Sequence, residues 1–270
     1  KDSVNMKCNQ KNIGTIKNSN LCVSGDTDIL TSKGVFKIKE IQGKEVDVWN
    51  GKQFSTVHPT KTGENQELLK IRFNNGSILK CTPYHKFYIR STSNHEQVVE
   101  AKDLSPGMKL IQCDFPVIYD GLNDFKAPYE HGLFSADQRY FPEYFKHFKD
   151  DGQEFKFNSF PPINYNLDIK LKWLSGFFDG SNVKLRQDVI YIENINIDNK
   201  FLLLVKNLLQ TIGINSVATT NSIVMFSSDV KNIVKLGFDS KKLHIQGILK
   251  LDKDSRLTVC VEEISNCSTK

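Results

Sequence analysis

The sequence lacks several features that would narrow its class at once. Its longest apolar run is the five residues of Phe201 to Val205, too short to cross a bilayer, and its start shows no signal peptide. Its six cysteines form no Cys-x-x-Cys pair and no disulfide framework, and its histidines lie at no metal-ligand spacing. We therefore expect a cytoplasmic protein in a reducing compartment, with no structural metal and no membrane partner.

Length and charge leave more open. A chain of 270 residues is long enough for one large or two modest domains, and we predict two. A net charge of +5 and a pI near 8.7 permit a nucleic-acid partner without requiring one. Because evenly spread lysines more often serve to solvate a surface, we favour that interpretation and keep DNA as a possible partner.

The chemistry of the sequence centres on Cys22 and on a Thr-x-x-His about sixty residues later. A thiol is the most nucleophilic side chain near neutral pH, so Cys22 can attack the preceding Leu21 carbonyl and convert the Leu21–Cys22 amide to a thioester. That reaction needs a proton for the leaving nitrogen and a group that orients the peptide. We expect His85 to supply the proton and Thr82 to orient the peptide.

At these residues the sequence resembles an intein, a self-catalysed protein splicing element. Cys-Val-Ser-Gly-Asp-Thr at 22–27 is similar to the first sequence block of that family, and Gly-x-x-x-x-x-Thr-x-x-His at 76–85 to its second. The resemblance implies that Cys22 performs the first N-to-S acyl shift with help from Thr82 and His85. It also implies a horseshoe-like β fold, shared with hedgehog autoprocessing domains and called the Hint fold, and no cofactor for splicing.

Residues 1–21 are polar, without a hydrophobic period, and their composition predicts a loop. They resemble the ribonucleotide reductase large subunit just ahead of its radical cysteine. The matching residues are Lys1–Ser3, Asn9–Lys17 and Ser19–Leu21. The match stops after Cys22, which implies that residues 1–21 are the end of an upstream host segment and that the host's own cysteine would follow the element.

Residues 22–112 carry the alternating pattern of half-buried strands. Phe36 and Ile38 alternate with lysines and predict one strand. Asn50-Gly51 and Asn75-Gly76 are strong hairpin turn signals, and the second hairpin delivers Thr82 and His85 to the end of a strand. The segment is predicted to be the N-terminal part of a mainly β splicing domain.

Residues 113–250 change to helical periods separated by strands, which predicts an inserted α+β domain. The order helix, two strands, helix is similar to half of a LAGLIDADG homing endonuclease. Residues 174–182 resemble one motif copy and residues 130–138 a decayed copy. The eighth place, where that family has a metal-binding carboxylate, is Ser181 in one copy and Asp137 in the other.

Cleavage by that family needs divalent cations between two carboxylates, and only one is present. We therefore expect a nuclease relic, with Mg²⁺ as a cofactor only of an active form. The simpler interpretation, which we favour over a functional nuclease, is that these helices form a core and that Asp137 is a surface acid.

Residues 251–270 predict a strand over Arg256–Ile264, which resembles the start of a late intein block. In the family a penultimate histidine, a terminal asparagine and a downstream nucleophile follow. We interpret Asn266-Cys267 as unrelated to that junction. The expected partners are therefore the remaining C-terminal intein segment and the downstream host segment.

Three hypotheses result. The first is a splicing element with a relic nuclease, divided as 1–21, 22–112, 113–250 and 251–270. The second is a site-specific DNA-binding protein or homing endonuclease, and the third is a fragment of a ribonucleoside-diphosphate reductase large subunit.

Overall fold

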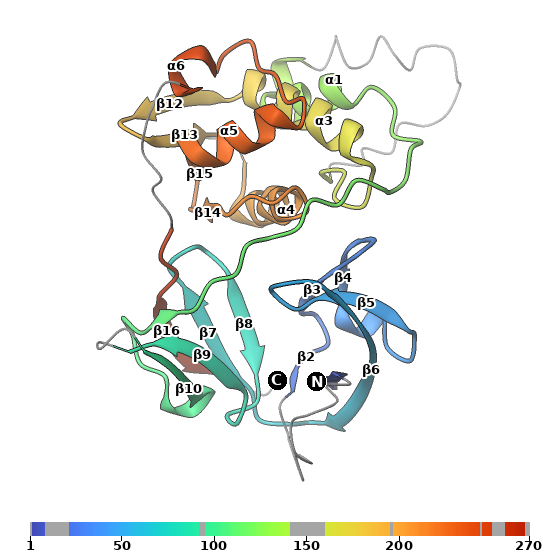
Figure 1. Ribbon diagram of the computed structural model, residues 1–270, viewed down its shortest axis with the longest axis vertical. Coiled ribbons are helices and arrows are strands. Elements are labelled where there is room, and N and C mark those ends of the chain that lie inside the picture. Colours follow the sequence, from blue (N-terminus) through green and yellow to red (C-terminus); the bar gives the residue numbers. More distant parts are fainter. Residues whose placement is uncertain are drawn as a thin grey trace. The chain divides into compact units, whose positions relative to one another are not determined.

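The computed structural model describes residues 2–8, 22–91, 95–140, 160–194, 197–243, 245–249 and 257–267, the first of these ranges as backbone only (Figure 1). The chain forms two compact units. Unit 1 comprises Lys1–Asp114 and Thr258–Lys270, and unit 2 comprises Phe115–Leu257. The architecture is mostly antiparallel β-sheet with some helices, which agrees with the predicted class at this coarse level.

Unit 1 contains two sheets. Among the described residues the larger sheet has nine strands in the order β16-β7-β8-β2-β1-β6-β5-β3-β4, and the smaller has the order β10-β9-β11. Figure 1 shows β16, from the end of the chain, beside β7. The strands are β1 (Asp2–Cys8), β2 (Val23–Ser24), β3 (Asp28–Thr31), β4 (Gly34–Lys37), β5 (Val46–Trp49), β6 (Phe54–Glu64), β7 (Leu69–Phe73), β8 (Ile78–Cys81), β9 (Lys86–Arg90), β10 (Glu96–Glu100), β11 (Lys109–Leu110) and β16 (Val261–Asn266). Two short 3-10 helices are η1 (Ile38–Glu40) and η2 (Ala101–Asp103).

Both predicted hairpins are confirmed. β5 and β6 pair antiparallel across a turn in which Gly51 has φ +96° and the Asn50 side chain accepts two backbone N–H groups. β7 and β8 pair across a turn with Gly76 at φ +82°. Both glycines adopt the left-handed region that side chains with a Cβ rarely enter, which is why Asn-Gly is a reliable signal. In β7, Ile71 is fully buried, as the alternation predicts.

Three strand and loop predictions need correction. The strand predicted through Ile38 ends at Lys37, where the Glu40 carboxylate accepts the Lys37 N–H and a 3-10 turn begins. The loop predicted over residues 1–21 is wrong for Asp2–Cys8, which pair as β1 with β2 and β6. Backbone pairing of this kind requires no hydrophobic period. The strand predicted over 256–264 begins at Val261, and Arg256 lies outside the described residues.

Unit 2 combines one sheet with helices. Its four described strands have the order β12-β13-β15-β14. They are β12 (Asn182–Arg186), β13 (Val189–Glu193), β14 (Val217–Ala218) and β15 (Ser222–Phe226). The described helices are α1 (Pro128–Ala136), η3 (Gln138–Tyr140), α3 (Leu167–Gly180), α4 (Asn199–Gln210), α5 (Ser227–Lys235) and α6 (Ile245–Leu249). The predicted helices correspond to α3 and α4 and one predicted strand to β13, while β12, between α3 and β13, was not predicted.

Helices α1 and α3 pack closely because glycines lie at their contact. A Cβ on Gly132 would clash with the Trp173 carbonyl oxygen, and one on Gly176 with the Tyr129 carbonyl oxygen. A Cβ on Gly180 would lie 2.7 Å from that of Ala136. The close contacts at these three glycines leave no room for a larger residue. The C-terminal ends of α1 and α3 therefore lie side by side, and so do the residues that follow each helix.

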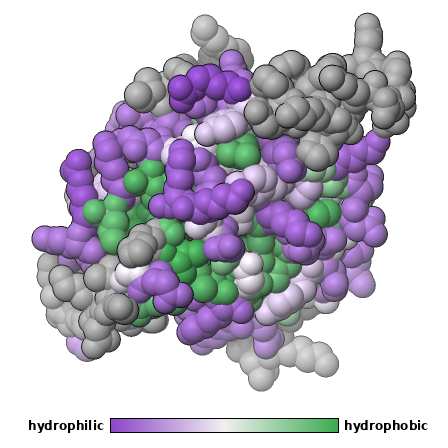
Figure 2. All heavy atoms as spheres, turned by 90° about the horizontal axis from the view of Figure 1, so that it is seen from above, coloured by the Kyte–Doolittle hydropathy of each residue, from purple (hydrophilic) through white to green (hydrophobic). Residues whose placement is uncertain are grey.

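Among the described residues no helix is both long and apolar enough to cross a bilayer. Hydrophobic residues gather near the middle of the face seen in Figure 2, with hydrophilic residues around them. Exposed apolar side chains are common on protein surfaces, so this patch alone assigns no partner.

Candidate functional sites

Sheet pairing brings Cys22 and Thr82 together. Cys22 directly precedes β2 and Thr82 directly follows β8, and these strands pair at Val23 and Cys81. The Cys22 backbone N–H donates to Thr82 Oγ1 at 3.2 Å, and the Thr82 N–H donates to the Cys22 carbonyl at 2.9 Å. Both residues are 4 % exposed. A hydroxyl therefore contacts the nitrogen of the Leu21–Cys22 amide, although Leu21 itself lies outside the described residues.

His85 lies in the same tight turn as Thr82. Its backbone N–H donates to the Thr82 carbonyl at 3.0 Å, and its carbonyl accepts the Ala101 N–H at 2.7 Å. The imidazole packs edge-on against Phe87, with ring centroids 5.3 Å apart. Burial lowers the pKa of His85, which favours the neutral ring. Its Nδ1 is buried and has no hydrogen-bond partner within the described part of the chain.

A further residue, Thr62 on β6, contacts the sulfur. Its Oγ1 lies 2.9 Å from Cys22 Sγ, and either atom can be the donor. Sequence reasoning missed Thr62 because it belongs to no motif. The contact depends on the register of a strand forty residues away, which no local pattern reveals.

Together these residues provide the parts that acyl transfer uses. They comprise a thiol, a hydroxyl on the nitrogen of the adjoining peptide link and, in the turn that follows, an imidazole whose Nδ1 has no hydrogen-bond partner among the described residues. Of the predicted residues, the structure brings Cys22 and Thr82 into direct contact and joins His85 to Thr82 through the backbone.

The second predicted group lies in unit 2, around a cavity of about 440 Å³. Asp137 and Ser181 are the residues directly after α1 and α3, and both line this cavity. The close packing of the two helices thus places the two eighth-place residues at one site. The other lining residues are Ala136, Arg139, Tyr140, Gly180, Asn182, Val183, Glu193, Asn194 and Lys242.

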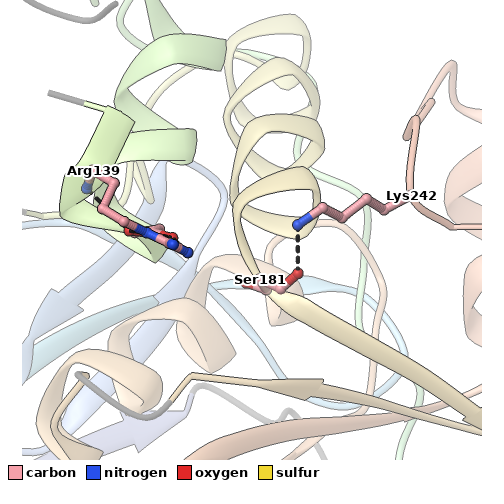
Figure 3. Close-up of polar contacts among 4 residues, drawn as sticks. Arg139, Ser181 and Lys242 are labelled. Carbon is pink, nitrogen blue, oxygen red and sulfur yellow. Dashed lines mark hydrogen bonds and ion pairs between the residues drawn. The ribbon is translucent and has the colours of Figure 1, made fainter. Parts of the chain in front are cut away.

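Two positively charged side chains of the chain itself, Arg139 and Lys242, line this cavity. Arg139 holds both carboxylate oxygens of Asp137, with Nη2 at 2.5 Å from Oδ2, and lowers the pKa of that carboxyl. Figure 3 shows the Lys242 amine reaching the end of α3, where it donates to the Ser181 carbonyl at 3.1 Å. The Ser181 hydroxyl turns back to donate to the Phe177 carbonyl.

These residues do not fit a magnesium ion. Mg²⁺ takes hard oxygen ligands, usually carboxylates, and here one carboxylate is already paired with Arg139 while a lysine amine stands beside Ser181. Glu193, on the cavity rim, is paired with Lys184 at 2.6 Å. Within the described ranges no group of three His, Cys, Asp or Glu residues is arranged to hold a metal.

Asp179, two residues before Ser181, is a buried acid that the sequence did not single out. It is 5 % exposed and accepts hydrogen bonds from the Tyr129 hydroxyl at 2.9 Å, the Ser240 hydroxyl at 2.6 Å and the Lys242 backbone N–H at 3.1 Å. This carboxylate ties α3 to α1 and to the loop that carries Lys242. By bonding the Lys242 backbone, it keeps the Lys242 amine in reach of the Ser181 carbonyl.

Comparison with known proteins relates the chain to the ribonucleoside-diphosphate reductase large subunit over much of its length. The subunit of that name from Invertebrate iridescent virus 6 is 35% identical over 253 residues, which cover 76% of this chain and 26% of the relative. The ribonucleoside-diphosphate reductase NrdEB subunit alpha of Bacillus subtilis is 25% identical over 151 residues. This match covers 50% of this chain and 14% of the relative. No protein-family model matches the chain.

A third relative carries a different name. The replication factor C small subunit of Haloquadratum walsbyi is 33% identical over 107 residues, covering 34% of this chain and 16% of the relative. The chain thus spans about a quarter or less of the length of each of these relatives. The names of the two reductase relatives support the third hypothesis drawn from the sequence, a relation to the ribonucleoside-diphosphate reductase large subunit. None of the three names mentions splicing.

Proposed function

We propose that residues from Cys22 onward belong to a self-splicing element within a protein related to the reductase large subunit, and that Cys22 cleaves the Leu21–Cys22 link. The observation that carries this proposal is the contact of Thr82 Oγ1 with the Cys22 amide nitrogen at 3.2 Å. A nucleophile whose own backbone nitrogen is held by a buried hydroxyl is arranged for chemistry on the preceding peptide bond.

The first step is an N-to-S acyl shift. Cys22 Sγ forms a bond to the Leu21 carbonyl carbon, the C–N bond of the amide breaks, and the thiol proton ends on the Cys22 nitrogen. His85 is suited to carry that proton. A neutral imidazole accepts it from the thiol, and because burial lowers the pKa of His85, the resulting imidazolium is a stronger acid toward the leaving nitrogen. No cofactor takes part.

The comparisons give this proposal indirect support. Residues 1–21 are less than a tenth of the chain, yet similarity to the viral reductase subunit covers 76% of it, so that relative shares part of the body that follows Cys22. The same chain is also similar to a replication factor C small subunit. Similarity to proteins of two different names is expected of an inserted element that is found in more than one host.

Completion of splicing, in this proposal, uses partners beyond the described residues. They are the C-terminal intein segment and the downstream host segment. Asn266 ends strand β16, paired with Leu69, and the following Cys267 N–H donates to the Leu68 carbonyl. We assign no role in the junction to either residue.

A second candidate is that the chain serves as part of a reductase large subunit without splicing. The comparisons favour it by name, and nucleotide reduction would then need the rest of that subunit. For unit 2 we propose a nuclease relic that has lost cleavage, because internal cations occupy the cavity at Asp137 and Ser181. A plasmid nicking assay with Mg²⁺ is expected to show no cleavage, and DNA binding stays a separate possibility for that unit.

Incubation of the folded chain with a thiol tests the main proposal. Wild-type protein is expected to release residues 1–21, detected by mass, and Cys22→Ala is expected to release none. Thr82→Val, which keeps the shape of the side chain but removes the hydroxyl, is expected to slow release about tenfold or more, the effect of one buried hydrogen bond. An intact wild-type chain that is folded by circular dichroism would favour the second candidate.

A further inference from the structure

We infer that Thr62 is a positioning residue for the Cys22 sulfur, a role that rests on the proposed function. The contact that identifies it is the 2.9 Å separation between Thr62 Oγ1 and Cys22 Sγ. Neither the motif at 22–27 nor the Thr-x-x-His at 82–85 includes Thr62.

The register of β6 explains how this side chain reaches the sulfur. In the sheet, β1 pairs with both β2 and β6. Along β6, Lys61 pairs with Val4 and Gly63 pairs with Ser3, and the register shifts between them. Thr62 is therefore the extra residue of a β-bulge. Bulges redirect a side chain, and this one directs a hydroxyl to the nucleophile.

With Thr62 included, three atoms of Cys22 are held by two threonines. Thr82 contacts the backbone nitrogen and carbonyl oxygen, and Thr62 contacts the sulfur. A cysteine side chain has one rotatable bond that decides where the sulfur points, and a contact at Sγ selects one of its staggered positions. Fixing the nucleophile in a single orientation lowers the entropic part of the barrier.

The Thr62 hydroxyl can form a hydrogen bond with the Cys22 sulfur both as a thiol and as a thiolate. A threonine hydroxyl can accept the thiol S–H before the reaction and donate to the thiolate that attacks. Cys22 is only 4 % exposed whereas Thr62 is exposed, so the contact lies where the buried sulfur meets the surface. Thr62 forms no covalent bond in this step, and its hydroxyl is protonated both before and after it.

The test compares thiol-induced release of residues 1–21 in three variants on β6. Thr62→Val removes the hydroxyl at constant shape and is expected to slow release about tenfold. Its pH profile is expected to move to higher pH, because the thiolate loses a donor. Thr62→Ser restores a hydroxyl and is expected to stay within about threefold of wild type. Thr60→Val, an exposed threonine on the same strand, is the matched control and is expected to leave the rate unchanged.

The outcomes separate this role from the proposed function. If wild-type protein and Cys22→Ala both stay intact, the proposed function fails, and the inference fails with it. If wild type releases the segment and Thr62→Val matches it in rate and pH profile, only the role of Thr62 is overturned. Equal slowing in Thr62→Val and Thr62→Ser, with an unshifted pH profile, would also overturn it by showing that the residue serves the fold alone.

Discussion

At the scale of single residues, burial weakens the affinity of the His85 imidazole for a proton. The pKa of His85 lies below its ordinary value because the ring is desolvated. The unfolded chain therefore binds a proton near pH 6.5 that the folded chain takes up only at lower pH. The stability associated with this ring is complete above about pH 6.5 and is lost as the pH falls through the folded pKa.

His85→Gln is expected to remove that dependence. Glutamine keeps a polar side chain of similar reach but does not titrate, so the fall in melting temperature between pH 7.5 and pH 5 should be smaller than in wild type. Thermal unfolding at the two values measures it, with the exposed His95→Gln as control. An equal fall in wild type and His85→Gln would show that the ring is not the titrating group.

The cations at the end of α3 lead to a second expectation. Ser181→Asp alone adds a second carboxylate beside Asp137, yet it should not create a Mg²⁺ or Mn²⁺ site, because Lys242 already contacts that position and Arg139 neutralises Asp137. Adding Lys242→Ala and Arg139→Ala frees both carboxylates. Titration calorimetry should then detect a divalent cation in the triple variant alone. Binding by the single variant would show that these two side chains do not block the site.

At the scale of secondary structure elements, α1 and α3 approach each other closely at their glycines. Gly176→Ala is expected to destabilise the chain by about 2 kcal/mol or more, because the added methyl group meets the Tyr129 carbonyl oxygen on the facing helix. Ser175→Ala, one residue earlier on α3, removes only a hydroxyl bonded back to Leu171 and is the control. Denaturant unfolding compares them, and equal stability would contradict the close approach.

Elements with a local signal were predictable, and those that depend on distant partners were not. Asn50-Gly51 and Asn75-Gly76 fix their hairpins through backbone geometry alone. The individual strand β12 was not recognised because most of its side chains are exposed and show no hydrophobic period. β1 was missed for a related reason, since only backbone pairing with β2 and β6 defines it.

The candidate sites divide in the same way. Spacing and residue type predicted Cys22 and Thr82 as one group, and the structure brings these two residues into contact. Thr62 and Lys242 were missed, since each reaches its partner only through tertiary structure, by a bulge in β6 and by a loop tied to Asp179. Such residues leave no periodic or motif signal in a single sequence.

At the scale of the whole molecule, the chain leaves unit 1 after Asp114 and returns to it at Thr258. Nearby residues of the two segments pair directly, since Lys109 bridges Cys260. The chain segments just before residue 115 and just after residue 257 are therefore joined within unit 1. A short flexible linker in place of residues 115–257 is expected to leave unit 1 folded and cleavage at Cys22 intact, measured as thiol-induced release. A folded deletion variant without activity would show that unit 2 contributes to the reaction.

The proposed attack of Cys22 on the Leu21 carbonyl produces a thioester that can be trapped directly. Hydroxylamine attacks thioesters far faster than amides, so treatment of the folded wild-type chain is expected to yield a fragment of residues 1–21 that ends in a hydroxamate on Leu21, identified by mass spectrometry. Cys22→Ala is expected to yield none. Recovery of only the intact chain from folded wild-type protein would contradict attack by Cys22 on the preceding peptide bond.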